Sequence, residues 1–381
     1  MILRAPLLSS PELQVLDQID DLRRKLRFAL SPPTRWEGLI RTAALAKTIR
    51  GSTAIQGYNL TLNDARALAE GEQPLEADES TTEAVLGYQR AMKYILRLSA
   101  DPSFRYSSDL LRCLHYMMLE HDPEKSPGQW RAGDFFVRGK LKKEIVHYGP
   151  DPDEVPELVE ELMSCLNVDP VDTHDVVCAA MAHLNLALIH PFSDGNGRMA
   201  RALQTLVLTR SRIIDPAFSS IEEYLGRNRL EYDAVLAEVR GDRWNPRGDA
   251  RQWIRFCLTA HYRQATTFLR RIERIGVVWD RVEQEVLRRK LPERLILALV
   301  DATLGYRVRN ITYRSAACIS EYLASRDLKA LVQAGLLVPH GDYRGRFYLP
   351  VDSLKSIRVA TRPKKAVEDP LLLIESSRAA G

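Results

Sequence analysis

The sequence predicts a mainly α-helical protein with one β-hairpin in its middle and a winged helix-turn-helix module near its C-terminus. Long stretches place apolar residues at steps of three and four, whereas β-prone segments are scarce. Within 127–150, two short β-prone runs flank a basic turn, which is typical of a hairpin with a solvated tip. Residues 292–355 combine helical segments with two final β-prone runs, which is the element order of a winged helix.

The predicted helices are separated by glycine, proline or serine, which often interrupt helices. In the first, 11–30, leucine and isoleucine form a single stripe, and Ser31-Pro32-Pro33 ends it. We expect Gly51 to break the next stretch, so that Ser52 or Thr53 caps a short separate helix that Gly57 closes. The further predicted helices span about 36–49, 52–57, 81–98, 107–119, 154–166 and 175–189, and the last is so apolar that it is predicted to be buried at the centre of its domain.

Apolar residues between Phe268 and Val286 recur at alternating steps of four and three. This spacing favours a connecting helix packed on the core, and a coiled-coil dimer seam is the alternative. In the C-terminal module we expect helices at 293–304, 315–322 and 325–334, and strands at 335–338 and 346–349. The predicted domains are a helical N-terminal region carrying the helix 52–57 (1–85), a core domain (86–265), a connecting helix (266–291), a winged-helix domain (292–355) and a frayed tail (356–381).

Composition and charge exclude several classes of protein. The 54 basic and 50 acidic residues leave a net charge of only +4, which does not by itself indicate a nucleic-acid partner. The N-terminal residues lack the apolar core of a signal peptide, and no apolar run approaches the roughly 18–20 residues that span a bilayer. Five cysteines are scattered without CxxC spacing, as expected of buried free thiols in a reducing compartment. The sequence thus predicts a soluble cytoplasmic protein without a membrane partner.

The most informative stretch runs from His190 to Arg201 and reads HPFSDGNGRMAR. Gly195 and Gly197 permit a turn whose successive N–H groups point into one concavity, and a helix that starts near Arg198 adds positive potential there. Arg198 and Arg201 lie three positions apart and would project from the same helix face, where guanidinium groups bind phosphates as forks. The pattern therefore predicts a polyphosphate site.

Two further residues of this stretch add chemistry to the phosphate site. Asp194 would repel a bare anion, so it is predicted to bind Mg²⁺ that bridges phosphate oxygens. His190 follows the apolar helix and precedes Pro191, a position from which it could accept a proton from an incoming hydroxyl. Any one of these residues alone is more often part of a helix cap than of a catalytic site, but their joint occurrence favours catalysis.

The stretch 190–201 resembles the HPFx[DE]GNGRxxR signature of Fic/Doc (Fido) proteins at every defining position. The segment 127–150 is similar to the family's flap, the hairpin that lays a target segment beside the active site. Residues 224–232 resemble the family's YLSxxIxxN+xxYY stretch, although Glu231 stands where an aromatic is usual. Residues 320–349 are similar to the winged helix appended to many bacterial members. The likeness covers about 30–350.

This resemblance implies a helical core of the Fic type and transfer of AMP from ATP to a Ser, Thr or Tyr hydroxyl of a protein, including the chain itself. Some family members transfer other nucleotides, phosphocholine or a phosphoryl group; an aspartate with paired arginines favours a triphosphate bound for AMP transfer. By the same resemblance His190 would be the base, Asp194 the Mg²⁺ ligand, Gly195, Asn196 and Gly197 the anion hole, Arg198 and Arg201 the ligands of the β- and γ-phosphates, and Asn228 a residue on the adenine side.

Many members carry an inhibitory helix with the pattern [ST]xxxE[GN], in which the glutamate pairs with the second arginine of the signature. Here the segment Ser52-Thr53-Ala54-Ile55-Gln56-Gly57 matches this pattern except for Gln56. Ser52 and Thr53 resemble the capping and nucleotide-facing residues. Without the signature at 190–201, this segment would be only a capped helical turn. Because a neutral amide binds arginine more weakly than a carboxylate does, we expect inhibition to be relieved in this chain. The same glutamate supports AMP removal in some relatives, so that reverse reaction is not expected here.

A different class of function is a nucleotide-sensing regulator that binds DNA through the winged helix, 292–365. The basic residues Arg344, Arg346, Lys355, Arg358, Arg362, Lys364 and Lys365 could contact phosphates. We do not favour it, because 325–334 offers no aromatic or Asn/Gln-rich recognition face. Winged helices also serve as docking or dimerisation modules, so a homodimer is possible.

Overall fold

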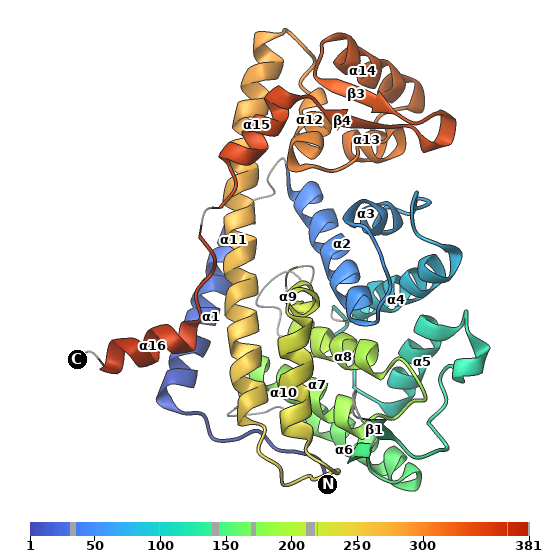
Figure 1. Cartoon of the computed structure of the whole chain (residues 1–381), viewed down its shortest axis with the longest axis vertical. Helices are drawn as coiled ribbons and strands as arrows, with labels where there is room; N and C mark the ends of the chain where they lie inside the picture. Colours follow the sequence, from blue (N-terminus) through green and yellow to red (C-terminus); the bar gives the residue numbers. More distant parts are fainter. Residues whose placement is uncertain are drawn as a thin grey trace.

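A computed structural model describes residues 1–30, 36–98, 100–138, 145–168, 173–210, 218, 220–363 and 365–379 of the chain. The fold is mainly helical, as predicted, and is built along α11 (Arg251–Arg288), a single helix of 38 residues. Figure 1 shows α11 as an upright spine, with the helices of residues 108–240 beside its lower half and the elements of residues 295–360 at its upper end. The predicted stop at Ser31-Pro32-Pro33 lies outside the described residues.

Up to residue 168, the described residues form six α-helices. α1 lies along the lower half of α11, whereas α2 leads from the upper part of the molecule down toward the predicted catalytic stretch (Figure 1). These helices span α1 (Ser10–Ala29), α2 (Glu37–Ile55), α3 (Leu62–Ala69), α4 (Glu79–Leu98), α5 (Ser108–Leu119) and α6 (Val155–Asn167).

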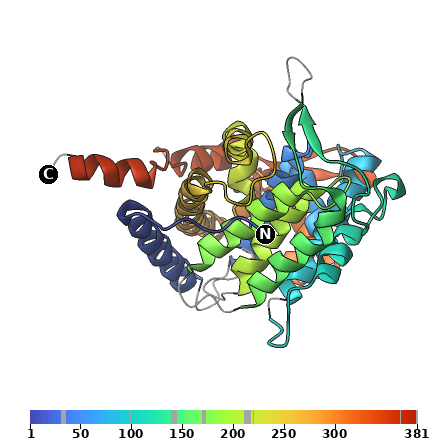
Figure 2. The same ribbon diagram turned by 90° about the horizontal axis from the view of Figure 1, so that it is seen from below.

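The predicted hairpin is present and consists of β1 (Phe136–Arg138) and β2 (Ile145–Tyr148), which pair antiparallel with Phe136 opposite Tyr148. It projects from the body of the molecule in Figure 2. Its base is held by a second segment, because Tyr148 N donates to Asp242 O at 2.9 Å and Trp244 N donates to Tyr148 O at 2.7 Å. Of the predicted basic turn, 138–143, Arg138 ends β1 and residues 139–143 lie outside the described residues.

The helix pair α7 (Asp175–Ile189) and α8 (Asn196–Arg210) forms the centre of the largest hydrophobic core. α7 is buried around most of its circumference, as its apolar sequence predicts. It ends at His190, whose φ of 52° turns the chain before Pro191. α9 (Glu222–Arg227) and α10 (Arg229–Arg240) then lead back to α11.

The apolar stripe of α11 is buried inside this chain. Phe268, Ile272 and Ile275 pack against Ile40 and Ala44 of α2. Further along, Trp279, Val282 and Val286 join the core of the C-terminal elements. The prediction of a helix packed on the core is therefore confirmed. Its expected start at 266 is wrong, because the same helix begins at Arg251 and already contributes Trp253 to the main core.

The C-terminal elements are three helices followed by an antiparallel pair of strands in which Leu337 lies opposite Pro350. The expected helix 315–322 is wrong, because one helix ends and the next begins within it. Cys318 takes a φ of 52°, and Ser320 then caps the next helix by accepting a hydrogen bond from Leu323 N. The elements span α12 (Leu295–Leu304), α13 (Asn310–Ala317), α14 (Glu321–Gln333), β3 (Leu337–His340) and β4 (Phe347–Pro350).

The prediction of a frayed tail is wrong. α15 (Asp352–Ala360) packs on α12, and α16 (Pro370–Ala379) packs on α1 and α11. Leu371 is buried in the main core, and Glu375 forms an ion pair with Arg255 of α11 at 2.6 Å. Burial of one apolar face is what orders this polar-looking segment, and sequence composition does not show it.

The expected break at Gly51 is also wrong, because α2 continues through it to Ile55. A Cβ at Gly51 would lie 2.3 Å from the carbonyl oxygen of Glu222, and a Cβ at Gly226 would lie 2.6 Å from Gly51 Cα. The two glycines thus let α2 and α9 touch backbone to backbone. The segment 52–57 is therefore the end of a long helix, with Gln56 as its cap and Gly57 turning the chain at a φ of 90°.

Two simpler predictions can also be compared with the structure. Among the described residues, no helix is both long and apolar enough to cross a membrane. All five cysteines are free thiols, as expected, but Cys113 and Cys318 are exposed, so the expectation that the thiols are buried is wrong for these two.

Candidate active site at the turn between α7 and α8

His190 stands at the start of the turn and is held as a neutral base. Burial lowers the pKa of His190 to about 4, and the nearby cation of Arg131 acts in the same direction. The hydrogen bond of the imidazole to Ala187 O and the carboxylate of Asp194 oppose this shift. Its Nδ1 lies 3.3 Å from Ala187 O, at the end of α7. With the Nδ1 proton directed at this carbonyl, Nε2 carries the lone pair and is the basic atom.

The base of the hairpin covers His190. Phe135 stacks on the imidazole with ring centroids 3.6 Å apart and planes 6° apart. Arg131 donates from Nε to His190 O at 2.9 Å, from Nη1 to Gly133 O at 2.8 Å and from Nη2 to Pro150 O at 2.6 Å. One guanidinium therefore ties both ends of the hairpin segment to the backbone of His190.

The turn after His190 is built by side-chain to backbone hydrogen bonds. Asn196 Oδ1 accepts from Phe192 N at 2.9 Å, and its Nδ2 donates to Phe192 O at 2.8 Å. Gly195 has a φ of 75°, and a Cβ there would lie 3.0 Å from Leu119 Cδ1, so only glycine fits without strain. The Asn196 side chain thus shapes the turn, and only its backbone N–H remains for the predicted anion hole.

His115 of α5 is a residue of this site that the sequence interpretation missed. Its Nδ1 accepts from Gly128 N at 2.9 Å, so the proton lies on Nε2, which contacts Asp194 O at 3.0 Å. The ring also stacks on Phe192 at 3.7 Å, and burial lowers its pKa to about 4. His115 therefore fastens the turn to the segment that begins the hairpin. A lone histidine on an amphipathic helix carries no sequence signal for this role.

Asp194 presents one carboxylate at the mouth of the turn. Its Oδ1 accepts from Gly195 N at 2.6 Å, and its Oδ2 lies 3.6 Å from Lys125 Nζ. The side chain is 40% exposed, and no group of three or more metal-ligating side chains occurs among the described residues. A single accessible carboxylate fits Mg²⁺ that takes its remaining ligands from phosphates and water. The bond from Gly195 N, however, keeps that N–H from the predicted anion hole in this arrangement.

Arg198 and Arg201 are almost fully buried on α8, with 2% and 1% of their surface exposed. Within the described residues, Nε and Nη1 of Arg198 and Nη1 of Arg201 have no hydrogen-bond partner. Burial lowers the pKa of Arg198, although Tyr58 and Asp194 oppose this. Buried cations with unmade hydrogen bonds are unfavourable unless an anion supplies acceptors. This face of α8, beside the helix N-terminus, therefore fits a polyanion.

The end of α2 closes against these arginines. Arg201 donates from Nε to Ser52 Oγ at 2.9 Å and from Nη2 to Ser52 O at 3.2 Å. A Cβ at Gly197 would lie 3.1 Å from Gln56 Nε2 and 3.2 Å from Arg201 Nη1, so both groups border Gly197. Thr53, expected to cap a separate helix, instead donates its hydroxyl to Ile49 O at 2.9 Å, because α2 continues through this turn. Its position facing the nucleotide stays a prediction.

Comparison with known proteins identifies the segment that carries this site. Residues 105–208 match the model of the Fic/DOC family. These residues form a Fic/DOC family domain. The match covers α5, the hairpin, α6, α7 and most of α8, which together build the turn and its supports.

Relatives extend the likeness beyond the Fic domain. The chain is 28% identical over 263 residues to a protein adenylyltransferase Fic from Nematostella vectensis, covering 67% of this chain and 56% of that protein. It is 32% identical over 237 residues to a protein adenylyltransferase Fic from Drosophila yakuba, covering 60% and 43% respectively. The chain thus spans about half the length of these curated relatives.

Solved structures share the fold. A Fic family protein from Desulfovibrio desulfuricans G20 aligns with a TM-score of 0.58 at 20% identity, covering 91% of this chain and 98% of that one. A Fic-domain signalling protein from Bacteroides thetaiotaomicron aligns with a TM-score of 0.55 at 21% identity, covering 69% and 97%. At these identities the comparison shows the common fold alone.

Not every predicted residue gathers at the turn. Asn228 joins α9 to α10 and donates from Nδ2 to Tyr224 O at 2.8 Å, and none of the described hydrogen bonds links it to the residues of the Fic signature. Glu231, which departs from the family pattern, is exposed, whereas the following residue Tyr232 is buried and contacts His183 Nε2 at 3.0 Å. The departure is therefore tolerated because its side chain faces solvent.

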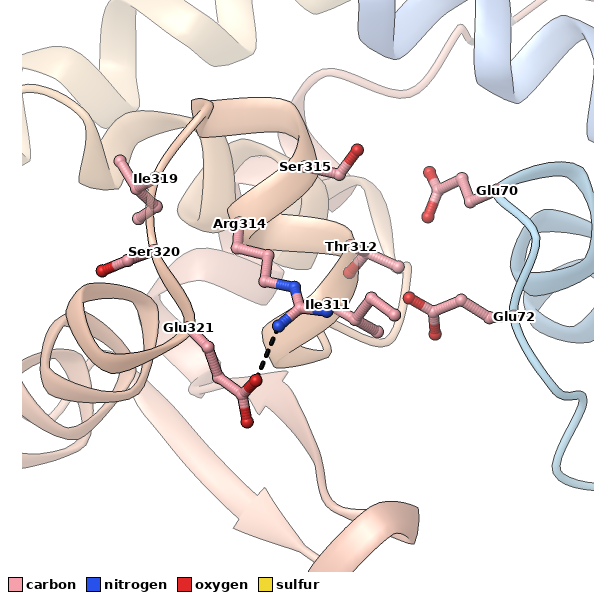
Figure 3. Close-up of a pocket in the computed structure, with 9 residues that line it drawn as sticks. All are labelled: Glu70, Glu72, Ile311, Thr312, Arg314, Ser315, Ile319, Ser320 and Glu321. Carbon is pink, nitrogen blue, oxygen red and sulfur yellow. Dashed lines mark hydrogen bonds and ion pairs between the residues drawn. The ribbon is translucent and has the colours of Figure 1, made fainter.

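A hollow of about 510 Å³ lies away from the Fic signature, between the segment after α3 and the helices α13 and α14 (Figure 3). Its three carboxylates each have a cationic partner: Glu321 binds Arg314 at 2.8 Å, Glu70 binds Arg66 at 3.0 Å and Glu72 lies 2.8 Å from Arg309. Only the Glu72–Arg309 pair joins the segment after α3 to the C-terminal elements, because each of the other two pairs lies within one of these parts. No residue of the Fic signature lines this hollow.

Proposed function

We propose that this chain is a protein adenylyltransferase, which transfers AMP from ATP to a Ser, Thr or Tyr hydroxyl of a protein and releases pyrophosphate. One observation carries the proposal: two buried arginines with unmade hydrogen bonds lie beside a turn that holds a neutral histidine. The relatives named protein adenylyltransferase Fic support the same reaction.

His190 acts as the general base. Its Nε2 takes the proton as the hydroxyl oxygen attacks the α-phosphorus, and the bond to the β-phosphate oxygen breaks as the new oxygen–phosphorus bond forms. A pKa of about 4 keeps the imidazole uncharged at neutral pH, so Nε2 is free to accept. The stacked Phe135 restricts rotation of the ring and directs its basic edge.

Arg198 and Arg201 bind the β- and γ-phosphates. Positive charge at this position stabilises the pyrophosphate that leaves, and burial strengthens the interaction because water does not screen it. Asp194 would hold Mg²⁺, which when bound neutralises phosphate charge. The backbone N–H groups at the start of α8 complete the anion hole at Asn196 and Gly197, and Asn228 stays assigned to the adenine side by family likeness.

The hairpin β1–β2 is the surface on which the protein target presents its hydroxyl. Its base lies against His190 through Phe135 and Arg131, which places a segment paired with β1 or β2 beside the catalytic base. The target of such backbone pairing is not specified by sequence, so auto-modification is the most accessible reaction to measure.

Intact-mass analysis of the purified chain with ATP and Mg²⁺ tests the proposal. We expect a covalent gain of one AMP per modified site. The His190→Ala variant should show this gain at a rate about 10²–10⁴-fold lower, which is the usual contribution of a positioned base. A gain of one phosphoryl group in place of AMP, or equal rates in the two proteins, would contradict the proposal.

A further inference from the structure

Arg201 belongs to a buried cluster contributed by four helices. Ser52 comes from α2, Tyr88 from α4, Arg201 from α8 and Glu222 from α9. None of the four is more than 1% exposed. The Tyr88 hydroxyl donates to Glu222 Oε2, and Ser220 Oγ donates to Glu222 Oε1 at 3.3 Å.

The guanidinium of Arg201 has two edges with different surroundings. Its Nε bonds to Ser52 Oγ at 2.9 Å and lies 3.9 Å from Glu222 Oε2, while Nη2 bonds to Ser52 O at 3.2 Å. Nη1, on the other side, faces Gly197 in the turn and has no hydrogen-bond partner among the described residues. A planar guanidinium held along one edge must present the other edge in a fixed direction.

Glu222 is a buried carboxylate outside the Fic signature, 1% exposed, and its Oε2 lies 3.9 Å from Arg201 Nε. Burial raises its pKa, and the positive charge of Arg201 is the largest influence that opposes this shift. Tyr88 stays protonated, because burial raises its pKa well above 10, and can therefore donate to the carboxylate at all ordinary pH values. The carboxylate is thus held in place from behind by donors that do not compete for phosphate.

We propose that Glu222 and Ser52 are positioning residues that hold Arg201 by its Nε edge so that Nη1 binds the terminal phosphates of ATP. This inference rests on the proposed function and assigns a role to two residues on either side of the backbone contact between α2 and α9. It also explains why Arg201 stays oriented although position 56 is a glutamine. The anchor lies at the opposite edge from Gln56.

The test compares two ligands in the full-length chain. Affinities for ATP and for AMP are measured by titration calorimetry with Mg²⁺ in the His190→Ala background, which prevents turnover. AMP lacks the phosphates that Arg201 would contact, so a positioning defect weakens ATP alone, whereas a general loss of structure weakens both.

We expect Glu222→Gln to weaken ATP binding about tenfold, because it removes the buried carboxylate that lies 3.9 Å from Arg201 Nε and orients the guanidinium, and to leave AMP binding within twofold. Ser52→Ala should weaken ATP about threefold, because it removes one neutral acceptor and leaves Ser52 O. The matched control is Glu223→Gln, since the adjacent glutamate binds Arg271 at 2.5 Å and not Arg201. It should leave the ratio of ATP to AMP affinity unchanged.

Equal losses for ATP and AMP in Glu222→Gln, or no loss for ATP, would overturn the positioning role. If Glu222→Gln does not fold, as judged by circular dichroism, the variants Ser52→Ala and Tyr88→Phe are used in its place. The positioning role is overturned if neither variant weakens ATP binding more than AMP binding. If the unsubstituted chain transfers AMP and the Glu222→Gln variant has the same ratio of ATP to AMP affinity as its parent, this inference alone is overturned. A parent chain that binds ATP no more tightly than AMP overturns the phosphate contact itself, and with it the proposed function.

Discussion

At the scale of single residues, burial is the property that makes the site reactive. It lowers the pKa of His190 and so keeps a base available, and it leaves the donors of Arg198 and Arg201 without water as a competing partner. The same side chains on the surface would be solvated and would bind phosphate weakly. Both the basicity of His190 and the phosphate binding proposed for the arginines therefore depend on the residue type and on burial of the side chain.

Gln56 provides the first prediction. Its amide nitrogen borders Gly197, as does Arg201 Nη1, a donor without a hydrogen-bond partner among the described residues. Gln56→Glu would place a carboxylate there, which should bind Nη1 more strongly by about 1 kcal/mol and compete with the γ-phosphate. We expect auto-modification by α-labelled ATP to fall several-fold. Gln56→Ala, which adds no acceptor, should not reduce it. An unchanged rate in Gln56→Glu would show that residue 56 does not control Arg201.

At the scale of elements, the contact between α2 and α9 determines how the site closes. Ser52 reaches Arg201 only because Gly51 and Gly226 let the two helix backbones touch. α2 also packs on α11 through Ile40 and Ala44, so its direction is set along its whole length. These contacts with α9 and α11 fix the positions of Ser52 and Gln56 at the end of α2.

Gly51→Ala tests this contact. The added Cβ would lie 2.3 Å from Glu222 O, so one helix must move, and overpacking of this kind costs about 1–3 kcal/mol. We expect a lower urea midpoint and a weaker ATP affinity, since Ser52 moves away from Arg201. Gly38→Ala in the same helix is the control: a Cβ there meets nothing within 4 Å, so it should leave stability unchanged or raise it by up to about 1 kcal/mol. Equal behaviour of the two variants would show that the close contact is unimportant.

At the scale of the whole molecule, several histidines are buried without charge. Burial lowers the pKa of His115 and His190 to about 4 and that of His183 to about 3, and it lowers that of His261 well below 6.5. The unfolded chain binds protons at these positions near pH 6.5, but the folded chain does not. The stability that each neutral histidine contributes is therefore fully present above pH 6.5 and is lost as the pH falls from about 6.5 towards its folded pKa, which is about 4 for His115 and His190 and about 3 for His183.

We expect the free energy of unfolding in urea to be lower at pH 5 than at pH 7, by up to about 1.4 kcal/mol per pH unit for each such histidine. Raised carboxyl pKa values, such as that of Glu222, act in the opposite direction, so a variant isolates the effect. His183→Gln should make the stability depend less steeply on pH. An equally steep dependence would mean that His183 is protonated in the folded state.

Local patterns predicted most of the helices, because an amphipathic or apolar stripe is a property of neighbouring residues. The same patterns failed at Gly51, at the tail after 356 and at the start of α11. Each failure concerns a segment whose partner is distant in sequence: α9 for Gly51, α1 for α16 and the main core for the first turns of α11. Propensity alone gives such segments the wrong ends.

The sequence by itself predicted the chemistry proposed for this protein, because the proposed base, the proposed metal ligand, the anion-binding turn and both arginines lie within one stretch, His190 to Arg201, whose local backbone brings them together. It also predicted the hairpin beside them. Only the tertiary structure decided how Arg201 is held, because Ser52 is 149 residues away and Glu222 arrives on another helix. Only it showed that His115 fastens the turn. The physical reason is burial: a charge or hydrogen bond acquires its strength from the groups that exclude water around it, and those groups come from the whole chain.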